Sequence, residues 1–248
     1  MTAQREFPQF FITAATPCPY LPGQVERKVF THLGGPLALA LNNQLSHSGF
    51  RRSQNIAYRP FCESCQACVS VRVPVEKFRW SRSFRRVMAQ NADLSTELLS
   101  GDAVCDHYPL FRNYIATRHG GGGMAEMSEA DFAAMIDCGV VNSRIAEYRF
   151  APDRPRAGAL AGAVLLDLLD DGLSMVYSYF DPALARRSVG TFLVLDTIRR
   201  AARLGLEFVY LGYWVKGSRT MNYKARYLPQ QRLGAEGWVE TDAAVPGW

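Results

Sequence analysis

A turn in the second half of the chain carries residue types that can bind an anion and move a proton. Residues 181–191 read Asp-Pro-Ala-Leu-Ala-Arg-Arg-Ser-Val-Gly-Thr. The unpaired N–H groups and positive dipole end of a helix N-terminus bind phosphate or a developing oxyanion. A capped helix after a proline turn accounts for the same residues without a function. We favour a binding loop because Arg186, Arg187, Ser188 and Gly190 occur together.

Residues 210–227 interleave aromatic side chains with lysine and arginine. This pattern suits single-stranded nucleic acid, because unpaired bases stack on aromatic rings while cations hold the phosphates. The candidates for binding such a strand are Tyr213, Trp214, Tyr223 and Lys224. Taken one at a time, Tyr213 and Tyr223 also fit ordinary strand and core packing, so the inference depends on the stretch as a whole.

Three cysteines, Cys62, Cys65 and Cys68, follow one another at intervals of two residues, and Cys18 offers a fourth thiolate. Thiolates at this spacing can bind zinc or an iron–sulfur cluster. A closed site needs four ligands, so Cys18 must then lie beside the other three. Buried thiols in a tight turn explain the same residues equally well. A nucleophilic cysteine is disfavoured, because no histidine lies near this cluster in the sequence.

The net charge of +5 conceals two strongly basic blocks. Residues 51–86 hold nine Lys and Arg against two acids, and residues 186–232 hold ten against two. A basic face attracts polyanions, since neutralising their phosphates releases counterions. Solvated arginine-rich helix faces give the same counts. The asymmetry favours an anionic partner without naming it.

The sequence gives no sign of a membrane partner. No apolar run reaches the roughly 18–20 residues that span a bilayer. Residues 1–9 lack the basic and then apolar layout of a secretory signal. We therefore expect a cytoplasmic protein whose cysteines are thiols or metal ligands rather than disulfides.

Residues 1–100 are expected to form a small N-terminal α+β region rich in arginine and cysteine. A proline start and a glycine end flank an apolar stripe that predicts a helix over 36–48. Valines alternate with other residues over 69–75, which predicts a half-buried strand, near a sheet edge because of Pro74. Residues 81–89 predict a short basic helix.

Residues 101–248 are expected to form a second domain. Apolar periodicity and turn residues predict strands over 94–98, 140–150, 157–169, 173–180 and 207–213, and helices over 103–118, 128–138 and 188–204. The order β-α-α-β-β-β-α-β is that of the GNAT acyltransferase fold, whose splayed sheet opens a cleft for an acyl donor. The sequence therefore predicts an α+β chain with a GNAT-like acyltransferase domain.

GNAT enzymes that use coenzyme A carry an Arg/Gln-x-x-Gly-x-Gly/Ala loop for its pyrophosphate. Residues 187–192 read Arg-Ser-Val-Gly-Thr-Phe, so Phe192 replaces the last small residue. This departure and the basic aromatic stretch speak against a coenzyme A-dependent N-acetyltransferase, which stays a less favoured alternative. A non-catalytic RNA-binding or metal-sensing module is a second one.

Several motifs, in order along the chain, resemble the arginyl/leucyl-tRNA–protein transferases. Those of the N-terminal half are 18–23, 26–30, 49–53, 58–60 and the cysteine cluster, and those of the C-terminal half are 177–182, 187–190, 210–214 and 221–227. The resemblance spans roughly residues 16–238 and is strongest to the bacterial branch, the aspartate/glutamate leucyltransferases. It implies transfer of leucine from leucyl-tRNA to proteins with N-terminal Asp or Glu, which marks them for N-degron proteolysis. Arginine as the transferred residue stays open, because the arginyl-transferring members share much of the pattern.

The implied reaction is the aminolysis of an activated ester, which needs positioning, amine deprotonation and oxyanion stabilisation but no cofactor. We expect Asp181 to hold or deprotonate the acceptor amine, whose unperturbed pKa is about 7.7–8.0. Tyr177 or Tyr179 is expected to donate to the leaving 3′-oxygen, since both share the period-2 strand face with Asp181. A turn cap is an equally common role for Asp181 before a proline.

The remaining assignments concern charge. The acceptor's Asp or Glu side chain needs a cation, preferably a bidentate arginine, and the candidates are Arg51, Arg52 and Arg72. The cations of the turn and of the aromatic stretch are expected to hold the tRNA end.

Overall fold

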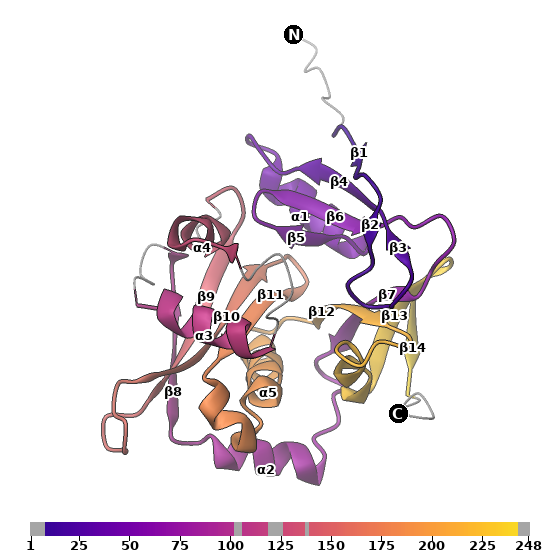
Figure 1. Ribbon diagram of the computed structural model, residues 1–248. Helices are drawn as coiled ribbons and strands as arrows, with labels where there is room; N and C mark the ends of the chain where they lie inside the picture. Colours follow the sequence, from indigo (N-terminus) through magenta and orange to yellow (C-terminus); the bar gives the residue numbers. More distant parts are fainter. Residues whose placement is uncertain (1–7, 102–105, 119–125, 137–138, 243–248) are drawn as a thin grey trace.

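An eight-stranded mixed sheet forms the centre of the molecule (Figure 1). The computed structural model describes residues 8–101, 106–118, 126–136 and 139–242. Across the sheet the strand order is β14-β13-β7-β12-β11-β10-β9-β8, and among these described strands only β11 and β12 pair in parallel. The strands are β7 (Cys68–Pro74), β8 (Leu94–Leu99), β9 (Ser143–Phe150), β10 (Leu160–Leu168), β11 (Gly172–Phe180), β12 (Phe208–Val215), β13 (Gln230–Gly234) and β14 (Gly237–Thr241).

Helices cover both faces of this sheet. On one face α2 (Arg82–Gln90) packs against α5 (Val189–Arg203), whose apolar side chains share a core with β10, β11 and β12. On the other face α3 (Tyr108–Arg118) and α4 (Glu129–Ile136) enclose a second core around Phe111 and Phe132. The central strands β10, β11 and β12 are thus mostly buried, whereas the outer strands β8 and β14 are largely exposed.

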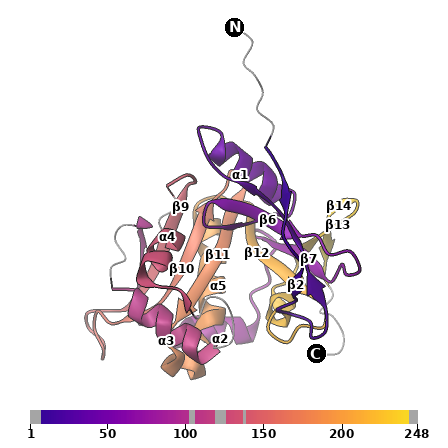
Figure 2. The ribbon, with the colours of Figure 1, turned by 45° about the horizontal axis from the view of Figure 1, so that its top comes forward.

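The N-terminal part adds a second sheet, which lies beside β11 and β12 (Figure 2). Its antiparallel order is β1-β4-β6-β5, and its strand β5 contacts β11. The elements here are β1 (Phe11–Ile12), β2 (Thr16–Pro17), β3 (Val25–Glu26), β4 (Lys28–His32), α1 (Ala38–His47), β5 (Arg51–Ser53) and β6 (Ile56–Pro60). Ala38 and Leu45 of α1 pack on Leu33 and Ala57 to form a small core of their own.

A buried ion pair fastens the N-terminal sheet to the large sheet. Arg52 of β5 donates from Nε and Nη2 to the carboxylate of Asp167 in β10, each at 2.7 Å. The hydroxyl of Ser143 in β9 also donates to this carboxylate at 2.7 Å. The Arg52 side chain is only 1% exposed. Because losing one partner leaves a buried charge alone, such a pair holds the two sheets in one relative position.

β11 and β12 part soon after they meet. Their parallel pairing joins residues 172–174 to 208–210 and then stops, whereas β11 continues beside β10 and β12 continues beside β7. Each strand carries a bulge at this point, at Val176 in β11 and at Leu211 in β12. A bulge bends its strand and increases its twist, which carries the two strands apart. We call the space between them the strand opening.

Most of the expected elements are confirmed with shifted ends. The helices expected over 36–48, 81–89, 128–138 and 188–204 coincide with α1, α2, α4 and α5, and the expected order holds as β8-α3-α4-β9-β10-β11-α5-β12. The helix expected over 103–118 begins at Tyr108, because the described residues 106 and 107 are not helical, and residues 102–105 lie outside the described residues. Residues 119–125, which follow this helix, and residues 137–138, which end the helix expected over 128–138, also lie outside the described residues.

Other features differ from the expectation. β7 is not near an edge, because it pairs with both β12 and β13, and Pro74 is its last residue. The sequence pattern does not predict the β13–β14 hairpin, which supplies that outer edge. The large sheet also crosses the boundary expected at residue 100, because it contains β7 and β8. No helix among the described residues is both long enough and apolar enough to cross a membrane.

Candidate active site

Arg51 lies in the strand opening. Its guanidinium donates from Nη1 to Ser174 Oγ at 3.1 Å and from Nη2 to the backbone oxygen of Met175, both on β11. On the β12 side it touches Gly212, where an added Cβ would stand 2.8 Å from the arginine Nε. Gly212 also has a φ of +80°, so two independent constraints require glycine there. Arg51 therefore bridges the parted strands while these contacts use only part of its fork of N–H donors.

Lys224 lies beside β12 near the same opening. It belongs to the short helix η4 (Asn222–Arg226), and its Nζ donates to the backbone oxygen of Tyr213 at 2.8 Å. The side chain is buried. Burial first, and then the charge of nearby Arg51, lower the pKa of Lys224 to about 7. Near neutral pH a large share of this amine is therefore uncharged.

Tyrosines surround these two basic groups. Tyr213 donates its hydroxyl to the backbone oxygens of Gly49 at 2.9 Å and Tyr58 at 3.1 Å, which ties β12 to the N-terminal part. Burial, and then the neighbouring Tyr58, raise the pKa of Tyr213, and the same two causes raise the pKa of Tyr20. The charge of Arg51 reaches both phenols. Both phenols therefore stay neutral at physiological pH, and Tyr213 acts as a hydrogen-bond donor.

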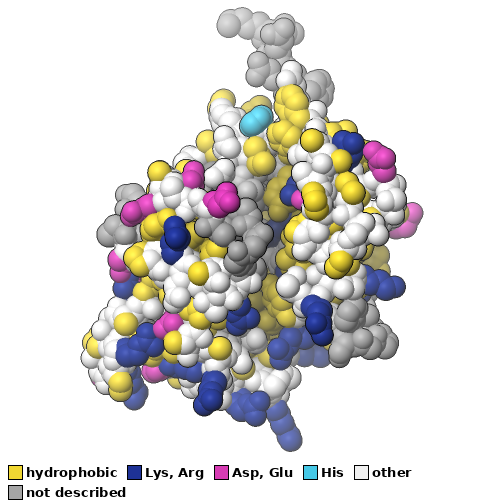
Figure 3. All heavy atoms as spheres, viewed as in Figure 1, with side chains coloured by type: hydrophobic (Ala, Val, Ile, Leu, Met, Phe, Trp, Pro, Cys, Tyr) yellow, Lys and Arg dark blue, Asp and Glu magenta, His cyan; other side chains and the backbone are white. Residues whose placement is uncertain are grey.

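The strand opening holds two basic groups, Arg51 and Lys224. Among the residues that the structure describes, no carboxylate forms an ion pair with Arg51 or Lys224. In the space-filling view a groove runs down this face, between the part that carries α3 and α4 and the part that carries β2 and β3 (Figure 3). A permanent cation beside an amine that titrates near pH 7 can hold a carboxylate and accept a proton.

Asp181 directly follows β11 and begins the short helix η3 (Pro182–Arg187). Its Oδ1 accepts from the backbone N–H of Ala183 at 2.9 Å, and its Oδ2 accepts from Arg156 at 2.8 Å. The turn cap that the sequence allowed is therefore present. Both carboxylate oxygens are engaged, and a role for Asp181 as a base stays a prediction.

The two tyrosines of β11 lie on one face, as expected, but in different surroundings. Tyr177 is partly exposed and packs against Phe111. Tyr179 is fully buried, and its hydroxyl lies 2.7 Å from His107 Nδ1. The other ring nitrogen, His107 Nε2, lies 2.6 Å from Glu147. In this arrangement Tyr177 can meet a substrate, whereas Tyr179 can influence one only through its neighbours.

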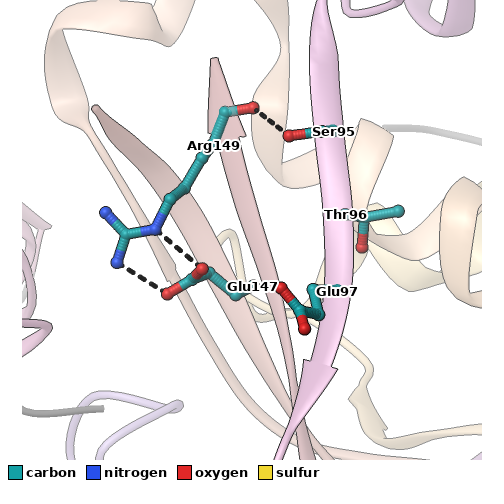
Figure 4. Close-up of a pocket in the computed structure, with 5 residues that line it drawn as sticks. All are labelled: Ser95, Thr96, Glu97, Glu147 and Arg149. Carbon is teal, nitrogen blue, oxygen red and sulfur yellow. Dashed lines mark hydrogen bonds and ion pairs between the residues drawn. The ribbon is translucent and has the colours of Figure 1, made fainter. Parts of the chain in front are cut away.

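The hydrogen bonds behind Tyr179 reach the surface at a hollow on β8 and β9 (Figure 4). The hollow is lined by Ser95, Thr96, Glu97, Glu147 and Arg149. Burial alone would raise the pKa of Glu147, but hydrogen bonds from Arg149 and His107 lower it overall. Glu147 is therefore a carboxylate, which accepts from His107 and leaves the other histidine nitrogen for the Tyr179 hydroxyl. The hollow lies at the β8 edge of the sheet, and β10 separates β11 from the two strands that line it.

The two arginines expected to hold the tRNA end have different surroundings. Arg187 turns back to pair with Asp93 and donates to the backbone oxygen of Gln90 at 2.6 Å, so it ties η3 to the end of α2. Arg186 is exposed and forms no ion pair within the described part of the chain. Arg186 is therefore the one of the two that faces solvent without a carboxylate partner.

The start of α5 is shaped by packing as much as by capping. Ser188 stands at the N-cap with a φ of +54°, and its side chain makes no cap hydrogen bond. Gly190 rests on Phe180, since an added Cβ would come within 2.9 Å of the phenylalanine ring. Phe192 is buried in the core and meets the ring of Tyr148. The small residue at 190 thus has a packing reason, and its role in ligand binding stays a prediction.

Of the three arginines expected to read the acceptor, only Arg51 lies in the strand opening. Arg52 is held in the buried ion pair between the two sheets. Arg72 of β7 donates to the Tyr210 hydroxyl at 2.8 Å, and its guanidinium lies 3.6 Å from the centre of the Phe208 ring. Both are engaged within the fold, so the geometry favours Arg51.

Two aromatic residues of the 210–227 stretch also differ in exposure. Trp214 is buried, and the guanidinium of Arg232 lies 4.5 Å from the centre of its ring. Tyr223 is 48% exposed and precedes Lys224 in η4. Tyr223 can therefore offer its ring to an unpaired base, whereas Trp214 serves the core.

The four cysteines gather in one region without converging on one point. Burial first, and then the neighbouring thiols of Cys18, Cys62 and Cys65, raise the pKa of Cys68 to about 12. Metal-ligand atoms that lie within 4.8 Å of one another occur elsewhere among the described residues, but not at these cysteines. Zinc bound at about 2.3 Å by each sulfur requires closer thiolates. As they are placed, the thiols do not fit a closed metal site.

The chain belongs to the arginine-tRNA-protein transferase family. The N-terminal region of the family matches residues 16–86, and its C-terminal region matches residues 106–234. An aspartate/glutamate leucyltransferase of Bradyrhizobium sp. (strain ORS 278) is 55% identical over 243 residues, covering 96% of this chain and 94% of that protein. One of Nitrobacter hamburgensis (strain DSM 10229 / NCIMB 13809 / X14) is 54% identical over 242 residues, with the same coverage. Among solved structures, the crystal structure of FemX has 10% identity and a TM-score of 0.47, covering 70% of this chain and 59% of that one.

Several residues of the site cannot be identified from the sequence. Ser174 and the backbone of Met175 hold Arg51, yet they stand in an apolar strand and carry no motif signal. Gly212 does carry one, because a glycine inside a predicted strand marks a bulge or a close approach. Tyr20 and Tyr58 lie within motifs quoted for the family resemblance, but nothing in the sequence brings them to one place.

We expect Lys224→Met to change how stability depends on pH. The pKa of Lys224 is about 7 in the folded chain and about 10.4 when unfolded, so between these values the unfolded chain binds more protons. The wild-type free energy of unfolding should therefore gain from Lys224 as pH rises above 7, and this gain is absent below pH 7. Relative to Lys224→Met, the wild type should gain about 2 kcal/mol between pH 7 and 9.

Urea unfolding of both proteins at several pH values measures this difference. A difference in the free energy of unfolding that is the same at every pH comes from the lost hydrogen bond to Tyr213 and not from titration of Lys224. If the difference between the two proteins does not change with pH, Lys224 titrates normally and the burial argument is wrong.

Proposed function

We propose that the chain transfers leucine from leucyl-tRNA to the N-terminal Asp or Glu of acceptor proteins, which directs them to N-degron proteolysis. Family membership and relatives about 55% identical over 96% of the chain, which are named aspartate/glutamate leucyltransferases, support this. The structural observation that carries it is Arg51, a cation without an acid partner among the described residues, held in the strand opening beside Lys224. Since charged tRNA is the donor, the reaction belongs in the cytoplasm.

The chemistry is the aminolysis of an ester. The acceptor α-ammonium loses a proton, its nitrogen attacks the leucyl carbonyl carbon, and a C–N bond forms. The ester C–O bond to the tRNA 3′-oxygen then breaks, and that oxygen takes the second proton of the amine. The ester is already activated, so the protein must position the reactants and stabilise the tetrahedral oxyanion.

Arg51 is the group that recognises the acceptor side chain in this proposal. A guanidinium can form two parallel hydrogen bonds to a carboxylate, which discriminates Asp and Glu from neutral residues. Its contacts to Ser174 and Met175 fix the orientation of the side chain without neutralising it. Acceptors that begin with a neutral residue leave this cation without its anion and should bind weakly.

Two groups can take the proton of the acceptor amine. The sequence predicts Asp181 for this role, but both of its oxygens already accept hydrogen bonds. Lys224 has a pKa of about 7, close to that of an α-amine, and no acid partner among the described residues holds it in the charged form. We therefore assign the proton to Lys224 and the ordering of η3 to Asp181. Tyr177 remains the candidate donor to the leaving 3′-oxygen.

The donor is proposed to approach along η3 and η4. Element order and the parting of β11 from β12 support a GNAT-like fold, in which an acyl donor enters where two parallel strands diverge. Arg186 of η3 and Tyr223 of η4 are exposed, so they can contact the phosphates and an unpaired base of the tRNA end. The proposed reaction uses no cofactor, and a metal at the cysteines stays a separate prediction that elemental analysis decides.

A transfer assay with two donors tests the function directly. Labelled leucyl-tRNA and arginyl-tRNA are incubated separately with peptides that begin with Asp, Glu or Ala. We expect label from leucyl-tRNA on the Asp and Glu peptides and little on the Ala peptide. Transfer from arginyl-tRNA instead would establish the arginyl alternative, and transfer from acetyl-coenzyme A would establish an acetyltransferase.

Arg51→Met should weaken recognition of the acceptor. Loss of a charge-assisted hydrogen bond of about 1.5–3 kcal/mol raises the KM for an Asp-starting peptide by roughly 10- to 100-fold. The KM for leucyl-tRNA should change much less. Arg59→Met, at an exposed position on the neighbouring strand β6, is the matched control. A KM for the peptide that stays at the wild-type value in Arg51→Met would remove Arg51 from acceptor binding.

Asp181→Asn separates the two candidate bases. We expect this variant to keep the wild-type pH profile of transfer between pH 6 and 9, because Lys224 accepts the proton. Lys224→Gln should instead lose the rise of activity around pH 7, while its kcat falls more than its KM for the peptide changes. A pH profile abolished by Asp181→Asn but kept by Lys224→Gln would return the role of base to Asp181.

A further inference from the structure

Helix α2 presents arginines to solvent on its outer face. Arg82, Arg85 and Arg86 are exposed, while Phe84 and Val87 between them are buried in the core. Positions three and four apart share one face of a helix, so the three side chains point outward together. The helix contains no acidic residue that could pair with them from within it.

The charges of α2 oppose its own dipole. Positive side chains near a helix N-terminus face its positive dipole end, which costs roughly 0.3–1 kcal/mol each at the surface. Arg82 is the first residue of α2 and Arg85 follows within its first turns, whereas α4 begins with two acids, as expected for a stable helix start. Folding alone therefore gives no reason for arginine at these positions.

Two further exposed arginines lie near α2. Arg226 of η4 lies over the ring of Phe84 in α2, with its guanidinium 5.2 Å from the ring centre. Arg186 of η3 adjoins Arg187, whose side chain reaches the last turn of α2. We call Arg82, Arg85, Arg86, Arg186 and Arg226 the α2 surface. In Figure 3, Lys and Arg side chains gather along the lower edge of the molecule, where Figure 1 places α2.

The α2 surface lacks the acids that pair with arginines elsewhere. Within the described chain none of its five members takes part in an ion pair. By contrast Arg187, Arg149 and Arg156 each pair with a carboxylate. The charges of such a patch of unpaired cations repel one another. A patch of this kind is typical of a surface that binds a polyanion.

The surface is suited to a duplex more than to a single strand. Its exposed side chains on α2 are arginine and small or polar residues, with no exposed aromatic ring on which a base could stack. RNA duplexes are bound mainly through their phosphates and 2′-hydroxyls rather than their bases. The same short helix η4 carries Arg226 outward to α2 and Lys224 inward to the strand opening, so the surface adjoins the site.

We propose that the α2 surface binds the phosphates of the RNA duplex that adjoins the aminoacylated 3′ end. This rests on the proposed function, in which the donor is a charged tRNA. The single-stranded end enters beside η4, and the stem that follows it lies along α2. The surface thus contributes to the affinity for the donor, while the strand opening carries out the transfer.

The test uses the variant Arg82→Ala/Arg85→Ala/Arg86→Ala in the full-length chain. We expect its Kd for leucyl-tRNA to rise by about tenfold, and the slope of log Kd against log salt concentration to fall by about 2 to 3. The KM for leucyl-tRNA should rise in parallel with little change in kcat. Transfer from leucyl-adenosine, a donor without a stem, should have the wild-type kcat/KM, which also shows that the variant is folded.

A control variant carries the same change of charge elsewhere. Arg112→Ala/Arg144→Ala/Arg154→Ala removes three exposed arginines from α3, β9 and the β9–β10 turn, and it should keep the wild-type affinity and salt slope for leucyl-tRNA. Equal losses in both triple variants would mean that net charge alone matters, and the proposal would be wrong.

Other outcomes separate this proposal from its rivals. An unchanged Kd and salt slope in the α2 variant, with an active wild type, overturns the proposal and leaves the proposed function standing. A wild type that uses neither leucyl-tRNA nor leucyl-adenosine defeats the proposed function instead. Binding of the wild type to phosphatidylglycerol vesicles, lost in the α2 variant while tRNA binding is kept, would assign the surface to an anionic membrane and overturn the proposal.

Discussion

The parting of β11 from β12 is the constraint on which the site depends. Two parallel strands that separate lose each other's backbone hydrogen bonds, and buried polar backbone groups need other partners. Arg51 supplies donors to β11 at Met175, and Lys224 supplies one to β12 at Tyr213. The side chains that stabilise the opening are therefore also the basic groups that a carboxylate and an amine can meet inside it. In the proposed function, structure and chemistry use the same two residues.

The two neighbouring arginines of β5 make different contacts, because successive side chains of a strand point to opposite faces. Arg52 is held by Asp167 in a fully desolvated pair, which fixes the N-terminal sheet on the large one. Arg51, one residue earlier, forms hydrogen bonds to neutral partners and pairs with no acid among the described residues. The N-terminal sheet thus places Arg51 in the opening, while Arg52 holds this sheet on the large one.

Local signals predicted much of this fold, whereas long-range partners were beyond them. Helices α1, α2, α4 and α5 follow from apolar periodicity and from end signals such as Ser128, whose hydroxyl accepts from Asp131 N–H as expected. The interior position of β7 depends on a hairpin more than 150 residues away, and no local pattern reveals it. Likewise, three candidate arginines look alike in sequence, and only the positions of Asp167 and Tyr210 in space distinguish them.

The bulge at Val176 sets which layer each side chain of β11 enters. Before it, Leu173 and Met175 join the core beneath α5, whereas after it Tyr177 and Tyr179 join the core beneath α3. Odd-numbered positions thus change sides within a single strand. A change of length by one residue here would exchange the two layers, while many substitutions would preserve them. The fold therefore constrains the length of this strand more strictly than its amino-acid composition.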